Sequence, residues 1–188
     1  HGPGLIDVLG YLPDGDAPEA TPFDAIASLP ASHPYSRLDA ATVRASLGFL
    51  DRNLDVPYVG LDAPGNAVVP GPLGNPLVAY GYPCSVADGA LARDGDMLLV
   101  DVAPLSGFDA TMAANRLQEA NPPMTVDAAS IDLTDVLERG ADRRWVAARL
   151  DREVTTEPAD RTLAPTFRES LESVVGDHDR IAIPATLG

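Results

Sequence analysis

The chain has 188 residues, 45% of them hydrophobic, and a formal net charge of −15. This length suffices for one good hydrophobic core or two small ones. The negative surface repels nucleic-acid phosphates and anionic membranes, so we expect direct binding to neither. No apolar run approaches the roughly 20 residues that a membrane-spanning helix requires, so we also expect no direct membrane insertion.

The composition of the charged residues is unusual. Aspartate outnumbers glutamate 21 to 7, and arginine supplies all 13 basic residues because the chain has no lysine. Dispersed acidity of this kind is typical of proteins from salt-loving cytoplasm, where high ionic strength screens self-repulsion. An acidic mesophilic protein is the alternative, but it leaves the absence of lysine unexplained. We predict a lower melting temperature in dilute buffer than in molar KCl, and equal melting temperatures would contradict this interpretation.

The first fifteen residues hold a glycine-rich loop followed by an apolar pattern. Gly2 and Gly4 flank a proline, a composition that permits close approach of the backbone to a ligand or to another chain segment. Apolar residues at positions 5, 8, 9 and 12 predict a short amphipathic helix that ends at the Pro-Asp-Gly turn of residues 13–15. An ordinary loop before a packed helix is the alternative interpretation of the glycines.

Residues 1–55 are predicted to form a helical leader. Residues 21–29 indicate one or two helical turns ended by Pro30. Asp39 is a plausible N-cap for a longer helix that runs to about Leu54, and its apolar residues recur on one face.

Residues 56–92 are rich in proline and glycine. Short apolar segments at 57–61, 67–69 and 77–80 alternate with turns and predict a small antiparallel β meander. Because prolines lack the amide donor of a β ladder, a mostly irregular loop is the alternative.

Residues 93–188 alternate between strand and helix patterns, which predicts an α/β unit. The expected strands are 97–102, 124–133 and 180–184, and the expected helices are 109–119, 142–150 and 163–175. The overall fold class is therefore α/β, with a partly parallel sheet and packed helices beside the small antiparallel β portion.

Most motifs that carry chemistry are missing from the sequence, including a nucleophile elbow, a phosphate loop and a zinc motif. The sequences Asp-Gly-Asp at 14–16 and 94–96 are interpreted as acidic turns, because the further ligands of a calcium loop are missing. Cys84 is predicted to be a small buried filler, and His178 a solvated turn residue. His33, beside Pro34 and Tyr35, is the best catalytic candidate, with a structural hydrogen bond as the alternative.

Two groups of residues are candidates for binding anions. Ser106 and Gly107 lie just before a predicted helix, whose N-terminus favours a phosphate or flavin group, although a plain strand-to-helix turn also explains them. Arg37 and Arg44 are spaced to hold a substrate phosphate, or alternatively to pair with surface carboxylates. We expect no metal site.

The segments 4–9, 12–15 and 33–38, in this order, together with 97–117 and 181–188, resemble the B subunit of anaerobic glycerol-3-phosphate dehydrogenase, a flavoprotein. This resemblance implies FAD or FMN in the full-length protein, with Gly2 and Gly4 near it, and oxidation of sn-glycerol 3-phosphate to dihydroxyacetone phosphate with electrons passed to quinone. It also implies two partners, the catalytic flavoprotein (A) subunit and the membrane-associated iron–sulfur (C) subunit. The location implied is cytoplasmic, at the inner face of the membrane through a partner.

The chain departs from that family in one respect. Its members begin with a strand and a Gly-x-Gly-x-x-Gly loop for the FAD pyrophosphate, which are missing here. We therefore expect a middle, substrate-facing or cap-type portion of a longer flavoprotein, which by itself is inactive and binds no cofactor. A docking or scaffold module without catalytic function, or a fumarate-reductase-like flavoprotein with another substrate, are the alternatives.

Overall fold

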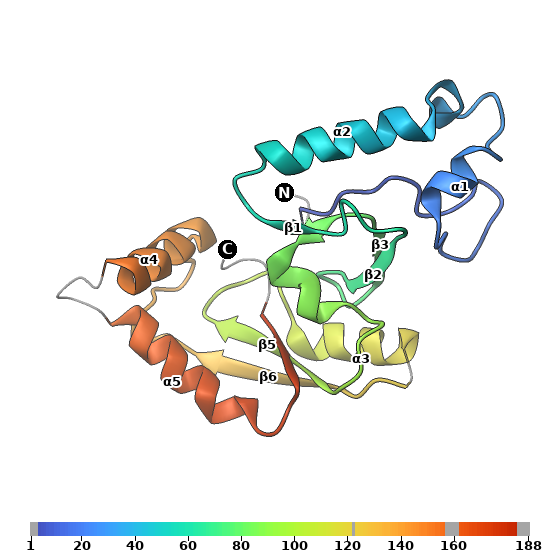
Figure 1. Ribbon diagram of the computed structural model, residues 1–188. Coiled ribbons are helices and arrows are strands. Elements are labelled where there is room, and N and C mark those ends of the chain that lie inside the picture. Colours follow the sequence, from blue (N-terminus) through green and yellow to red (C-terminus); the bar gives the residue numbers. More distant parts are fainter. Residues whose placement is uncertain (1–3, 122, 157–161, 184–188) are drawn as a thin grey trace. The chain divides into compact units, whose positions relative to one another are not determined.

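The computed structural model describes residues 4–121, 123–156 and 162–183 (Figure 1). The chain divides into two compact units. The first unit comprises His1–Pro70 and Pro76–Arg93, and the second comprises Gly71–Asn75 and Asp94–Gly188. The division into a helical leader, a β-rich part and an α/β unit stays a prediction. So does the assignment as a middle portion of a flavoprotein.

The first unit combines short helices with two-stranded sheets. Its elements are α1 (Pro22–Ile26), the 3-10 helix η1 (Pro34–Arg37), α2 (Ala40–Asn53), β1 (Tyr58–Val59), β2 (Ala67–Pro70), β3 (Pro76–Ala79), β4 (Tyr82–Pro83) and the 3-10 helix η2 (Cys84–Gly89). Both predicted helices of the leader are confirmed. The Asp39 side chain caps α2 as expected, because its Oδ1 accepts a hydrogen bond of 2.6 Å from the Thr42 amide.

The helix predicted for residues 5–12 is wrong. This segment is irregular, with bends at positions 8, 10 and 11, and Ile6 forms an antiparallel bridge with Gly81. The Ile6 amide donates to the Gly81 carbonyl at 2.8 Å, and the Tyr80 amide donates to the Ile6 carbonyl at 2.9 Å. Val8 and Leu9 pack into the core of α1 and α2, whereas Leu5 packs with the strands. Pairing with a distant segment thus satisfies the backbone groups that a local helix would have used.

The predicted antiparallel pairing is confirmed, but the strands form two separate pairs instead of one meander. β2 pairs with β3 in the register Ala67↔Ala79, and β1 pairs with β4. Pro70 and Pro76 face each other at the last position of the β2–β3 ladder. Prolines at this end of a two-stranded ladder are compatible with the sheet.

The second unit contains a parallel sheet with packed helices, which the predicted fold class includes. Its elements are β5 (Met97–Ala103), α3 (Ala110–Ala120), β6 (Val126–Asp132), α4 (Arg143–Thr155), α5 (Leu163–Val175) and β7 (Arg180–Ala182). The three strands form a parallel sheet in the order β6-β5-β7. The last predicted strand is shorter than expected, and Pro184 lies outside the described residues.

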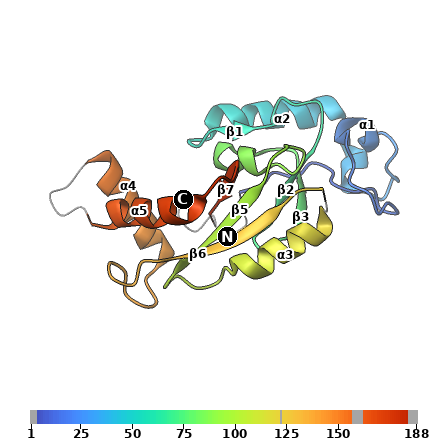
Figure 2. The same ribbon diagram turned by 90° about the horizontal axis from the view of Figure 1, so that it is seen from below.

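Helices cover the two faces of this sheet, as Figures 1 and 2 show for α3 and α5. Leu98, Val100 and Val102 of β5 pack in one cluster with Val146 of α4 and Leu163 of α5. Because side chains alternate along a strand, the intervening residues face α3. β5 is accordingly buried on both faces, as its continuous apolar sequence predicts. The helices that the structure describes are all too short or too polar to cross a membrane.

Candidate functional site

The loop from β5 to α3 lies at the carboxyl end of the central parallel strand. In open α/β sheets ligands bind at this end of the strands, so the loop is a candidate binding site. Ser106 and Gly107 are exposed there, and Gly107 has φ of 90°. A Cβ built on Gly107 would overlap Nη2 of Arg143, so the glycine lets a guanidinium lie directly against the loop.

Arg143 is a site residue that the sequence analysis missed. It is the first residue of α4, and the Asp142 side chain caps this helix by accepting a 3.1 Å hydrogen bond from the Trp145 amide. The contact joins positions 36 residues apart, which no local motif predicts. The sequence does hold one indication of such a role. A cation in the first turn of a helix interacts unfavourably with the helix dipole, so an arginine at this position suggests a function other than stabilising the helix.

The N-terminus of α3 already carries carboxylates of the protein itself. Oδ1 of Asp109 accepts from the Met112 amide at 2.8 Å, and Oδ2 of Asp101 accepts from the Ala110 amide at 3.3 Å. A bound anion would therefore meet two negative charges at this helix end. The guanidinium of Arg143 and the hydroxyl of Ser106 are the better match for a phosphate oxygen, because arginine binds phosphate with charge-assisted hydrogen bonds. Arg143 and Ser106 therefore supply donors of the kind that bind phosphate oxygens.

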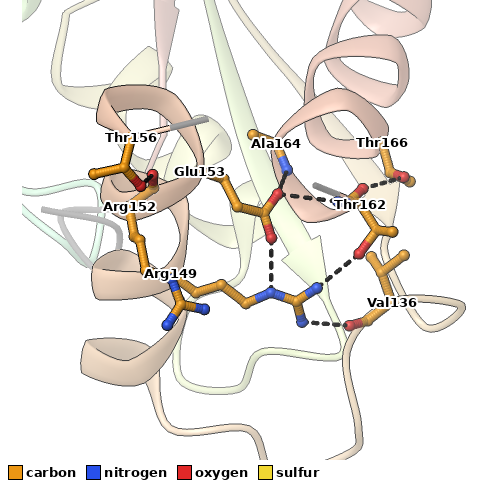
Figure 3. Close-up of polar contacts among 8 residues, drawn as sticks. All are labelled: Val136, Arg149, Arg152, Glu153, Thr156, Thr162, Ala164 and Thr166. Carbon is orange, nitrogen blue, oxygen red and sulfur yellow. Dashed lines mark hydrogen bonds and ion pairs between the residues drawn. The ribbon is translucent and has the colours of Figure 1, made fainter. Parts of the chain in front are cut away.

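The N-terminus of α5 is closed by a buried carboxylate, as Figure 3 shows. Oε2 of Glu153, on α4, accepts from the amides of Ala164 at 2.8 Å and Thr162 at 3.2 Å. Oε1 of Glu153 accepts from Nε of Arg149 at 2.8 Å. Arg149 also donates to Oγ1 of Thr162 at 2.7 Å and to the Val136 carbonyl at 3.5 Å. Burial raises the pKa of Glu153, but the hydrogen bonds from Ala164 and Arg149 outweigh it and leave the pKa below its ordinary value.

The candidate residues of the first unit mostly have structural contacts. Nδ1 of His33 accepts a 3.2 Å hydrogen bond from the Tyr35 amide at the start of η1, so in the neutral ring the proton is on Nε2. Arg37 is exposed in η1. The guanidinium carbon of Arg44 lies 3.7 Å from the centre of the Phe23 ring, which is a cation–π contact.

The glycines of the N-terminal loop are placed only in part. Gly2 lies outside the described residues. Gly4 has φ of 71°, and its carbonyl accepts a 2.6 Å hydrogen bond from the Tyr58 hydroxyl. A Cβ at Gly4 would lie 3.2 Å from that hydroxyl and 3.3 Å from Pro83. The predicted close approach therefore exists at Gly4, where a neighbouring strand pair makes it.

Two predictions about side chains are wrong. Cys84 is exposed at the start of η2, immediately after β4. Its backbone amide donates a hydrogen bond to the Pro57 carbonyl, so the backbone and not the side chain makes the contact with the rest of the protein. His178 is not a solvated turn residue, since its Nδ1 lies 2.8 Å from the Val175 carbonyl and its Nε2 lies 3.0 Å from Oδ2 of Asp127. Asp127 is the second residue of β6, and only the assembly of the parallel sheet places it there.

The first Asp-Gly-Asp sequence belongs to a turn, as predicted, because the Gly15 amide donates to the Leu12 carbonyl at 3.0 Å. The second has a bend at Gly95, and the Asp96 amide donates to Oδ2 of Asp179 at 3.1 Å. Within residues 4–121, 123–156 and 162–183, no group of three or more His, Cys, Asp or Glu side chains is arranged to hold a metal ion.

The fold is that of an α/β protein, with an exposed loop and an arginine against it at the carboxyl end of a parallel strand. Over 98% of its length the chain is 37% identical to proteins from two strains of Halobacterium salinarum that are named as the probable B subunit of anaerobic glycerol-3-phosphate dehydrogenase. It is 28% identical, again over 98% of its length, to the protein of Pectobacterium atrosepticum named as the B subunit of the same enzyme. The resemblance predicted from the sequence is thereby confirmed.

The chain spans 44% of the length of each of these curated relatives. No family model matches it, and no solved structure does. The names of the relatives describe subunits of a dehydrogenase, which is an oxidoreductase. This chain is therefore similar to part of such a subunit.

Proposed function

We propose that the full-length protein is the B subunit of a flavin-dependent dehydrogenase that oxidises sn-glycerol 3-phosphate to dihydroxyacetone phosphate. The observation that carries this proposal is the 37% identity over 98% of the chain to proteins with that name. FAD or FMN, electron transfer to quinone, the flavoprotein (A) and iron–sulfur (C) partners, and a location at the inner face of the membrane through a partner belong to the same proposal. A bound flavin would supply hydride acceptance and onward electron transfer.

Within this proposal, Arg143, Ser106 and Gly107 bind a phosphoryl group of the flavin. Their support is the position of the loop at the carboxyl end of β5 and the guanidinium lying against Gly107. Arg37 and Arg44 remain proposals for the substrate phosphate, and the contact of Arg44 with Phe23 gives that residue a structural role as well. His33 remains the catalytic proposal. It has less support as a base, because its Nδ1 already accepts the Tyr35 amide.

The test uses the full-length protein, purified in high salt with its partner proteins. Its flavin absorbance is recorded before and after addition of glycerol 3-phosphate. Bleaching of a bound flavin is the expected result. A colourless protein that still binds its partners would contradict the proposal and favour a docking module.

A variant tests the binding residues. Arg143→Ala removes the guanidinium, and we expect about tenfold weaker flavin retention during dialysis. Arg168→Ala is the matched control, because Arg168 is an exposed arginine of α5 that pairs with Glu172. Equal retention in both variants would remove Arg143 from the site while leaving the dehydrogenase proposal in place.

A further inference from the structure

The outward side of α4 carries an exposed tryptophan within a row of exposed residues. Trp145 is the single tryptophan of the sequence, and it is 53% exposed. Ala148 and Arg152 follow it at spacings of three and seven residues, which place them on the same side of the helix, and Arg144 lies one turn before Ala148. All four residues are exposed. We call these four residues the α4 face.

Trp145 lies near Arg149, which belongs to the network of Figure 3. The guanidinium carbon of Arg149 lies 5.4 Å from the centre of the Trp145 ring. Arg149 is itself fixed by hydrogen bonds to Glu153 and Thr162, of 2.8 and 2.7 Å. An exposed aromatic ring that is already ordered loses little conformational entropy when a partner covers it.

The charge around the α4 face is opposite to that of the molecule. Residues 138–153 contain five of the thirteen arginines and four carboxylates, in a chain of net charge −15. Among these carboxylates, Glu153 pairs with Arg149 and Asp142 caps the helix. Tryptophan and arginine are the residue types most enriched at the energetic centres of protein interfaces.

We infer that the α4 face docks an acidic segment of a protein partner. Carboxylates of the partner pair with Arg152 and its neighbours, and an apolar side chain of the partner covers Trp145 above the small side chain of Ala148. A protein segment is favoured over a membrane or a nucleic acid, because an extended phosphate surface would also face the many carboxylates of the rest of the chain. This inference does not depend on the proposed enzymatic function.

The experiment uses the full-length protein and, as the probe, a random copolymer of glutamate and tyrosine. Tryptophan emission is followed during titration with the copolymer in the wild type and in Trp145→Phe, and the difference between the two is the emission of Trp145. Binding is measured in parallel by calorimetry. We expect saturable binding with a blue shift of Trp145. We expect about tenfold weaker binding for Arg152→Glu, and a loss of similar size for Trp145→Ala by calorimetry.

Arg168→Glu is the matched control, because it changes the net charge equally on an exposed position of α5. Weakening by Arg152→Glu but not by Arg168→Glu would support the docking surface. Equal effects of the two reversals, or no emission shift with the copolymer, would overturn it. A stronger response to phosphatidylglycerol vesicles or to duplex DNA would overturn it in favour of those partners. If Trp145 is already shielded from acrylamide in the isolated full-length protein, the rest of the same polypeptide covers the face and the partner proposal fails.

Discussion

The backbone amides at the N-termini of α3 and α5 are satisfied by carboxylates in two different ways. Both ends present backbone amides that need acceptors, and both receive carboxylates from the protein itself. At α3 one carboxylate is the exposed local cap Asp109, and the adjoining loop is open and touched by Arg143. At α5 the carboxylate is the buried Glu153 of another helix, neutralised by Arg149. The difference separates an end whose adjoining loop is exposed from an end that is closed by packing.

The largest effect is expected from breaking the closed end. Glu153→Gln removes a buried charge that accepts from Arg149 and from two amides of the α5 N-terminus, and leaves the guanidinium without its counter-charge. We expect the free energy of unfolding to fall by about 3 kcal/mol. Denaturant titration measures this free energy of unfolding. In Glu172→Gln, whose partner Arg168 is exposed, the loss should stay below about 0.5 kcal/mol. Similar losses in the two variants would show that the burial of Glu153 does not increase its contribution to stability.

A smaller effect is expected at the open end. Asp109→Ala removes the side chain that accepts from the Met112 amide and should cost about 1 kcal/mol, as for other helix N-caps. The same measurement on Asp142→Ala, the equivalent cap of α4, provides the comparison. A loss at Asp109 as large as that at Glu153 would mean that the α3 end is closed as well, and would count against a ligand there.

The smallest effect concerns pH at the other end of α5. His178 lies between the Val175 carbonyl and Asp127, and both of its ring nitrogens face acceptors, so the imidazolium fits best. The hydrogen bond to Asp127, followed by that to Val175, raises the pKa of His178. A raised folded-state pKa contributes stability that is complete below the unfolded pKa of about 6.5 and is lost as pH rises through the folded value.

The check is the melting temperature between about pH 6 and about pH 9, a range that brackets the ordinary histidine pKa. Wild-type protein should lose stability over this range by more than His178→Gln does. His33→Gln is the control, because the Nδ1 of His33 accepts a hydrogen bond. Identical pH profiles for wild type and His178→Gln would show that the contact with Asp127 contributes nothing. Glu153 acts in the opposite direction, because its lowered pKa gives stability that is lost only as pH falls.

Local sequence determined most of the second unit and the long helix of the first. The caps Asp39, Asp109 and Asp142 each act within three residues, so they mark their helices without reference to the rest of the fold. The apolar run of β5 likewise identifies a buried parallel strand, and residues 163–175 form the predicted helix. The order of the motifs was also enough to indicate the relatives that the comparison found.

Tertiary structure decided what depends on distant partners. The apolar spacing of residues 5–12 suits a helix, yet the segment is irregular and Ile6 pairs with Gly81. Arg143 reaches Gly107, and His178 reaches Asp127 across 51 residues. Glu153 reaches the first amides of α5 across 9 and 11 residues, well beyond the helical spacing of three or four. These contacts form only when the parallel sheet and its helices have brought the residues together, because hydrogen bonds and ion pairs act at a few ångströms while local patterns extend over a few residues.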